Sequence, residues 1–222
     1  LRLGRTQWNP NLPSHFTSIP HLSKTRPTFD HSIIDWNNPT DLESSCSGRK
    51  LLPNGQLPRI LWKLQRQRHY GSLKLVRGAD IPWEEKKDQA VWRGSLTGRR
   101  YDNVKLFSTD VQLDETCHLI PRCRLAMLYH NSTLVDTKLV HDRSQHKYTA
   151  PTVLYGEHMT MRELLQYKIL IVLEGNDVAT GLKWALLSNS VVLMPKPTIS
   201  SWFMEELLQP YVHYVPIEDD LS

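Results

Sequence analysis

The stretch that decides the fold is residues 167–216, YKILIVLEGNDVATGLKWALLSNSVVLMPKPTISSWFMEELLQPYVHYVP. It contains the short apolar run Ile169–Leu173, whose β-branched residues are typical of a strand buried on both faces of a parallel sheet. From Val178 to Leu186 the apolar residues recur at helical spacing, and at Val191–Met194 the pattern returns to that of a strand. The stretch therefore begins as a strand, a helix and a second strand.

The same stretch continues with a predicted helix over Ser200–Leu208 and a predicted strand over Tyr211–Val215. Strands that alternate with helices of about ten residues indicate βαβ units, and right-handed crossovers arrange such units in a parallel sheet. We therefore expect an α/β fold. Ligands of such folds bind beyond the carboxyl ends of the strands, so the turn Gly175–Asp177 is the expected binding loop.

Composition and charge indicate a globular protein with a basic surface. The chain has 222 residues, 40% of them hydrophobic, and a formal net charge of +4. Lys and Arg gather at residues 59–68, 86–87 and 93–100, which suits either a solvated surface or an anionic ligand such as a phosphate. No apolar run approaches the roughly 18 residues of a membrane span, and no signal peptide is visible.

Both ends of the sequence look cut. The chain opens at Leu1 rather than Met and stops at Ser222 shortly after a predicted strand, so we expect a fragment of a longer protein. Any targeting segment or membrane anchor would lie in the missing parts. Residues 1–58 are dense in Pro, Asn, Ser and Thr and predict loop, with Asp41–Gln56 as an insertion, and residues 57–70 predict a short strand and the start of a helix.

A second informative stretch is residues 89–98, QAVWRGSLTG. A buried strand ends here in Arg93, Gly94, Ser95 and Thr97, which offer a guanidinium, two hydroxyls and unobstructed backbone N–H groups. Such a set fits a diphosphate, although a structural turn is the commoner role of such a tract. Because the P-loop lysine and the G-x-G-x-x-G spacing are both absent, we exclude a P-loop NTPase and an ordinary dinucleotide fold.

The middle of the chain predicts a helix over Arg122–Tyr129, a strand over Leu134–Lys138 and a helix over Met159–Gln166 that Thr160 and Glu163 would start as a capping box.

The three cysteines show no metal spacing and no disulfide framework; one pair could form, and Cys117 and Cys123 are nearest in sequence. The scattered histidines also lack a metal-binding spacing, so we expect no metal site. These histidines are His118, His130, His141, His146 and His158.

Four motifs, taken in order, resemble the signature set of the CAP10-type glycosyltransferases. They are Ala90–Ser95, Leu173–Trp184, Ser188–Leu193 and His213–Pro216. These enzymes form glycosyltransferase family 90, which includes Rumi-type protein O-glucosyltransferases and bacterial lipopolysaccharide glycosyltransferases. The resemblance covers residues 57–222 well and residues 15–35 loosely.

The resemblance implies a GT-B architecture, in which two Rossmann-like domains face a cleft. Residues 1–74 would be a partial, loop-rich acceptor-side region, and residues 75–222 a nucleotide-sugar-binding domain truncated at its C-terminus. The donor would be UDP-glucose or UDP-xylose, the acceptor a hydroxyl of a protein or glycan, and no metal cofactor would be needed. A eukaryotic member would work in the ER or Golgi lumen and a bacterial one in the cytoplasm.

The motifs and the chemistry of the loops together give a set of candidate donor-binding residues. They are Arg93, Gly94, Ser95, Thr97, Gly175, Asn176, Asp177, Thr180, Lys183, Glu205 and His213. Guanidinium groups and helix N-termini of this kind stabilise the charge that grows on a leaving diphosphate. Three of these residues could instead have a purely structural role: Asp177 as a helix cap, Glu205 as a solvated helix residue and His213 as a core histidine.

Two departures from the family pattern bear on mechanism. Many members carry an Arg where this chain has Gly181, and Lys183 is our candidate to supply the same charge. Its ammonium would act as a single positive charge and not as a planar guanidinium that binds two oxygens at once. The family's catalytic carboxylate would fall near residues 1–6, LRLGRT, which contain no acid, so we expect the base upstream of the chain or missing. Asp30 and Asp35 are fallback candidates, and the catalytic residue stays unknown.

The sequence thus predicts transfer of a hexose or pentose from a UDP-sugar to a hydroxyl, with the stereochemistry left open. Two alternatives differ in class. One is an inactive relative that binds a nucleotide sugar without turnover, which the missing base favours. The other is a nucleic-acid-binding module that uses the basic cluster at residues 59–68; it predicts salt-sensitive binding, whereas the main hypothesis predicts no nucleic-acid partner.

Overall fold

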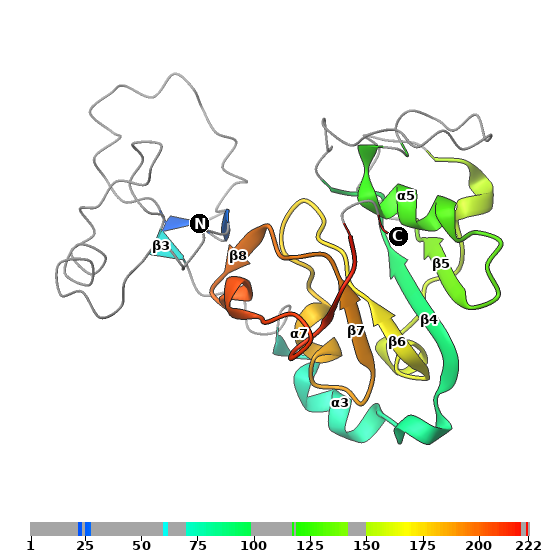
Figure 1. Ribbon diagram of the computed structural model, residues 1–222, viewed down its shortest axis with the longest axis horizontal. Coiled ribbons are helices and arrows are strands. Elements are labelled where there is room, and N and C mark those ends of the chain that lie inside the picture. The colour runs from blue at the N-terminus through cyan, green and yellow to red at the C-terminus, as the bar shows by residue number, and fades with distance from the viewer. Residues whose placement is uncertain are drawn as a thin grey trace.

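The computed structural model describes residues 22–23, 25–27, 60–61, 70–98, 117, 119–141, 150–218 and 221. Their centre is one five-stranded sheet, formed by β4 (Lys87–Gly94), β5 (Val135–Leu139), β6 (Tyr167–Ile171), β7 (Val191–Met194) and β9 (Val215–Pro216) (Figure 1). The strand order is β5-β4-β6-β7-β9, and all neighbours are parallel. The predicted α/β fold with a parallel sheet is confirmed. The two-domain GT-B architecture and the boundary at residue 74 stay predictions.

The connections between the strands are short helices. They are α3 (Leu73–Ala79), α5 (Pro121–Leu128), α6 (Met161–Leu164) and α7 (Leu182–Ala185), with 3₁₀ turns η3 (Trp83–Glu85), η4 (Thr152–Leu154) and η5 (Glu205–Leu207). The predicted helix at residues 122–129 is α5, and Thr160 and Glu163 form the expected capping box at the start of α6. The helix predicted after the glycine loop is confirmed as the single turn α7.

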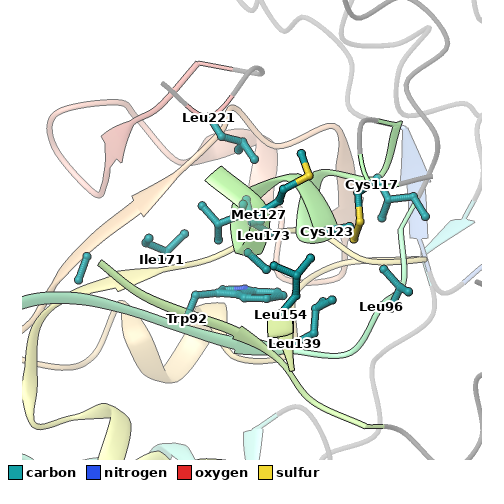
Figure 2. Packing of buried hydrophobic residues seen from close by; sticks show 14 residues of the cluster. Trp92, Leu96, Cys117, Cys123, Met127, Leu139, Leu154, Ile171, Leu173 and Leu221 are labelled. Atoms are coloured by element: carbon teal, nitrogen blue, oxygen red, sulfur yellow. A yellow bond between two sulfur atoms is a disulfide. The ribbon is translucent and has the colours of Figure 1, made fainter. Parts of the chain in front are cut away.

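The sheet is buried on both faces, as its apolar runs predict. On one face α5 covers a cluster that includes Trp92, Leu139 and Ile171 (Figure 2). On the other face Val91 and Leu170 pack with residues of α7. Adjacent residues of β4 thus enter opposite cores, because side chains along a strand alternate between its faces.

The predicted helix over Ser200–Leu208 is wrong. Ile199–Ser201 is strand β8, which pairs antiparallel with β2 (Thr25–Pro27). After β8 the chain turns through Met204, whose φ is 61°, into η5. The carboxylate of Glu205 accepts hydrogen bonds from the N–H and hydroxyl of Ser201, and such local side-chain bonds compete with a helix.

The structure also bears on two other strands that the sequence predicts. The strand predicted over Tyr211–Val215 is confined to β9, because Tyr211 lies in a turn with φ 60°. The short strand predicted within residues 57–70 is β3 (Ile60–Leu61), which pairs in parallel with β1 (Leu22–Ser23). The proposed insertion Asp41–Gln56 lies outside the described residues. Within the described part of the chain, every helix is too short or too polar to span a bilayer.

Lys86 is a buried cation in one of the basic clusters, for which the sequence suits either a solvated surface or an anionic ligand. Its side chain is fully buried, and its Nζ lies 2.5 Å from Oδ1 of Asp80 and donates to the carbonyl of Leu165. Asp80 also accepts from the N–H of Asn189 at 2.6 Å. The pair therefore joins the end of α3, the start of β4 and the turn before β7.

We expect Lys86→Ala to lower the free energy of unfolding by about 3 kcal/mol, because it leaves the carboxylate of Asp80 buried without its cation. Urea denaturation measures the loss. Lys74→Ala, on the exposed side of α3, is the matched control and should change stability by no more than about 0.5 kcal/mol. Equal stability of the two variants would show that the buried pair contributes nothing.

Candidate functional site

The candidate site lies where three neighbouring strands end. Residues 95–98 follow β4, residues 174–177 follow β6 and residues 195–198 follow β7, so all three loops share the carboxyl edge of the sheet. The N–H of Gly98 donates to Oδ1 of Asn176 at 3.2 Å, which joins the first two loops. Ligands of parallel α/β sheets bind at this edge. The structure therefore brings together the two loops that the sequence singled out.

Arg122, at the N-terminus of α5, fills the space between these loops. Its Nε donates to the carbonyl of Glu174 at 3.0 Å and one terminal nitrogen to that of Leu173 at 2.9 Å. The other terminal nitrogen donates to the hydroxyl of Thr97 at 2.9 Å and to the carbonyl of Ser95 at 3.3 Å. One guanidinium thus holds the ends of β4 and β6 in register with each other.

The charge of Arg122 is partly stripped of water. Burial lowers the pKa of this guanidinium to about 10, and the negative charge of Asp177 opposes the shift. At neutral pH the group stays protonated, since its pKa lies well above the solvent pH. A desolvated cation surrounded mainly by neutral oxygens attracts an anion strongly, because little water competes for it.

Gly175 allows this arrangement. A Cβ at its position would lie 2.9 Å from a terminal nitrogen of Arg122 and 3.0 Å from the Thr97 hydroxyl. The first contact is closer than real Cβ atoms show, and the hydrogen bonds of the guanidinium oppose its displacement, so Gly175 provides the close approach of backbone and guanidinium. Its own N–H donates to the carbonyl of Asp177 at 2.9 Å, which closes a tight turn.

A pocket opens beside the loops, between the ends of β6 and β7. It is open to solvent and is walled largely by apolar side chains such as Val178, Leu182 and Met194. Two carboxylates, Glu174 and Glu205, also line it. Apolar walls with a few polar groups are typical of small-molecule sites.

Glu205 and Lys183 form a buried ion pair at this pocket. Their side chains are 2% and 1% exposed, and Lys183 Nζ lies 3.6 Å from Glu205 Oε1. The ammonium also lies 4.9 Å from the ring centroid of Phe203. Glu205 is therefore no solvated helix residue, and Lys183 faces a carboxylate and an aromatic ring.

Arg93 and Gly94 serve the sheet itself. The Arg93 guanidinium lies 2.9 Å from a carboxylate oxygen of Asp136 on β5 and donates to the backbone carbonyls of Trp92 and Asp136. A Cβ on Gly94 would lie 2.5 Å from the ring of Trp92, so glycine permits that ring to fold back against the strand. The structure thus gives both residues structural contacts at the end of β4.

The remaining candidates divide by position. Asp177 and the exposed Thr180 belong to the segment between β6 and α7, close to the site. His213 precedes β9 on the amino side of that strand, and its Nδ1 accepts from the N–H of Gln209 at 2.9 Å. It is exposed, so it is not a core histidine, and it is not brought together with the loops.

The base of α5 carries a disulfide. Cys117 and Cys123 are bonded, so the pair that the sequence left open forms, next to Arg122. Both cysteines are fully buried. Among the described residues, no three His, Cys, Asp or Glu side chains gather as a metal ion requires.

Arg122 and Glu174 are the site residues that sequence reasoning missed. A signal for Arg122 was present: it follows Pro121 in the first turn of a predicted helix, where a cation is unfavourable to the helix dipole. A charge in such a place needs a partner outside the helix. Glu174 had a signal of a different kind, because it directly precedes the glycine of the binding loop.

Comparison with known proteins finds relatives that belong to one family. The model of the family "Glycosyl transferase family 90" matches residues 67–222. The chain is 35% identical to O-glucosyltransferase LpsA of Dichelobacter nodosus over 194 residues, which are 87% of this chain and 51% of that protein. It is 31% identical to protein O-glucosyltransferase 2 of Danio rerio over 153 residues, 66% of this chain and 25% of that protein.

The chain spans about half the length of the first of these relatives and a quarter of the second. The family match, by contrast, runs through more than half of this chain and includes all five strands of the parallel sheet. The chain therefore belongs to glycosyltransferase family 90.

Proposed function

We propose that this chain forms the donor site of a glycosyltransferase that moves a hexose or pentose from a UDP-sugar to a hydroxyl of a protein or glycan. The observation that carries the proposal is the position of Arg122, a partly desolvated cation held between the Ser95–Thr97 and Glu174–Gly175 segments at the carboxyl edge of the sheet. The two relatives named as O-glucosyltransferases support the reaction class.

The chemistry follows from where charge develops. An acceptor oxygen attacks the anomeric carbon, the bond from that carbon to the diphosphate breaks, and the departing UDP takes the electron pair. A guanidinium fixed beside the diphosphate stabilises this growing charge without reorganising. Four of the five N–H groups of Arg122 donate to protein acceptors, and the fifth has no acceptor among the described residues. That N–H is our proposed contact to a phosphate oxygen.

The pocket beside the loops would take the organic part of the donor. Its apolar walls suit the face of a ring, and Glu205 offers a carboxylate to hydroxyl donors. UDP-glucose and UDP-xylose are the donors we propose. The proton of the acceptor would go to a carboxylate that is not identified among the described residues. The localisation, which is the ER or Golgi lumen for a eukaryotic protein and the cytoplasm for a bacterial one, stays a prediction.

Isothermal titration of the chain with UDP, ADP and inorganic phosphate tests the donor site. We expect UDP and ADP to bind more tightly than phosphate, because both can fill the anion site and the pocket, and UDP to bind most tightly because the proposed donor is a UDP-sugar. Hydrolysis of UDP-glucose and UDP-xylose by the full-length protein then tests turnover. Failure of UDP to bind would overturn the proposal, and binding without any turnover by the full-length protein would favour the inactive relative.

Salt dependence separates the nucleic-acid alternative. The Lys and Arg residues of the cluster at 59–68 lie outside the described residues, so no structural observation favours it. That alternative requires binding of RNA or DNA that weakens steeply with salt. We expect none at physiological ionic strength.

We expect Gly175→Ala to weaken UDP binding by about tenfold, because overpacking of this kind costs about 1–3 kcal/mol and displaces the guanidinium. Titration calorimetry measures the loss. Gly78→Ala is the matched control: nothing lies within 4 Å of a Cβ there, and it should leave UDP binding unchanged. An unchanged UDP affinity in Gly175→Ala would place the diphosphate away from Arg122.

A further inference from the structure

Glu174 connects the proposed donor loop to a strand outside the main sheet. Its Oε1 accepts from the N–H groups of Thr198 at 2.9 Å and of Ile199 at 3.1 Å, and its Oε2 accepts from the hydroxyl of Thr198. Its own backbone carbonyl accepts from Arg122. The residue therefore touches the candidate anion site through its backbone and the start of β8 through its side chain.

Glu205 holds the other end of β8 in the same way. Its Oε2 accepts from the N–H of Ser201 at 2.6 Å and its Oε1 from the hydroxyl of the same residue at 2.7 Å. The N–H groups of alternate residues point to the same edge of a strand. Along β8, the groups of Ile199 and Ser201 point to the two carboxylates, which stand where a neighbouring strand would be.

The opposite edge of β8 belongs to the N-terminal part of the chain. β2 pairs with it antiparallel, with Thr25 opposite Ser201 and Pro27 opposite Ile199. β8 is buried throughout, with Ile199, Ser200 and Ser201 at most 1% exposed. One edge of this strand thus meets carboxylates that line the pocket, and the other meets a segment more than 160 residues earlier in the sequence.

We propose that Glu174 is a positioning residue that couples occupancy of the donor site to the pairing of β8 with β2. A diphosphate beside Arg122 would order the loop at residues 174–177, Glu174 would pass this order to Thr198 and Ile199, and the β8–β2 pair would tighten. The N-terminal part of the chain would then be fixed against a filled donor site. This inference rests on the proposed function, since it needs a ligand at Arg122.

Hydrogen–deuterium exchange of the whole chain, with and without saturating UDP, tests the coupling. We expect UDP to slow exchange in peptides that cover residues 198–203 by about tenfold, a typical strength of coupling between two sites. Peptides from α3 should exchange at an unchanged rate. Calorimetry of the same samples reports whether UDP is bound. If UDP fails to bind, the proposed function and this inference both fall; if it binds without slowing residues 198–203, only the inference falls.

Variants of Glu174 separate positioning from general folding. In Glu174→Gln the amide oxygen still accepts from both N–H groups and the amide nitrogen donates to the Thr198 hydroxyl, so the UDP-induced protection should persist. In Glu174→Ala it should vanish even at a UDP concentration that calorimetry shows to saturate the variant. Thr198→Val, which removes only the hydroxyl partner, should lose part of the protection and keeps the test decisive if the alanine variant fails to fold. The coupling would be overturned if Thr198→Val kept full protection and Glu174→Ala either kept full protection as well or failed to fold.

Discussion

Arg122→Ala should weaken UDP binding by about 100-fold. The variant removes the cation proposed to face the diphosphate, and hydrogen bonds to charged groups contribute about 1.5–3 kcal/mol, which corresponds to roughly ten- to 150-fold in affinity. It also releases the carbonyls of Leu173 and Glu174 and the hydroxyl of Thr97 from their shared donor. Titration of the purified chain with UDP measures the change.

Two controls distinguish a ligand contact from a structural clamp. Arg162→Ala removes an exposed guanidinium from α6 and should leave UDP affinity unchanged. Arg122→Lys keeps the charge but loses the planar fork, so we expect intermediate affinity. If Arg122→Ala binds UDP as tightly as the parent while its free energy of unfolding falls, Arg122 is a clamp between β4 and β6 and not a donor contact.

The sheet could be predicted because its strands are buried on both faces. In Ile169–Leu173 and Val191–Met194 every position is apolar, and a short run of this kind is typical of a strand between two cores. Such runs report burial directly, so local sequence suffices to find them.

The segment after β7 could not be predicted by the same means. Its apolar spacing resembles that of a helix, but Ser200 and Ser201 are fully buried in a strand that forms against β2. The turn that follows uses a positive φ at Met204, a residue type that rarely adopts one. Both features depend on residues distant in sequence, which periodicity within a short window does not detect.

For the candidate site, the sequence indicated the loops, and the structure shows the contacts between them. Arg93 ends a strand next to a glycine, so it looks like a phosphate ligand, yet its charge is matched by Asp136 on the neighbouring strand. Arg122 lies 27 residues from Ser95 and 52 from Glu174, and only the parallel pairing of β4 with β6 brings the three together. Sequence motifs located the loops, whereas the cation between them required the fold.

Lys183→Met should lower the free energy of unfolding by about 3–5 kcal/mol. Methionine fills a similar volume, but it leaves the Glu205 carboxylate, 2% exposed, without the cation 3.6 Å away. Urea denaturation measures the loss. Lys196→Ala, an exposed lysine at the mouth of the same pocket, is the matched control and should change stability by no more than about 0.5 kcal/mol.

The double variant Lys183→Met/Glu205→Gln shows whether the loss comes from the pair. Glutamine keeps an acceptor for the N–H of Ser201 and a donor for its hydroxyl but carries no charge, so we expect the double variant to recover about half of the lost stability. If Lys183 instead bound a phosphate of the donor, Lys183→Met would weaken UDP binding and leave stability unchanged. Because the ammonium lies between a buried carboxylate and the Phe203 ring, we expect Lys183→Met to lose stability. Its UDP affinity should fall only to the extent that the wall of the pocket is disturbed.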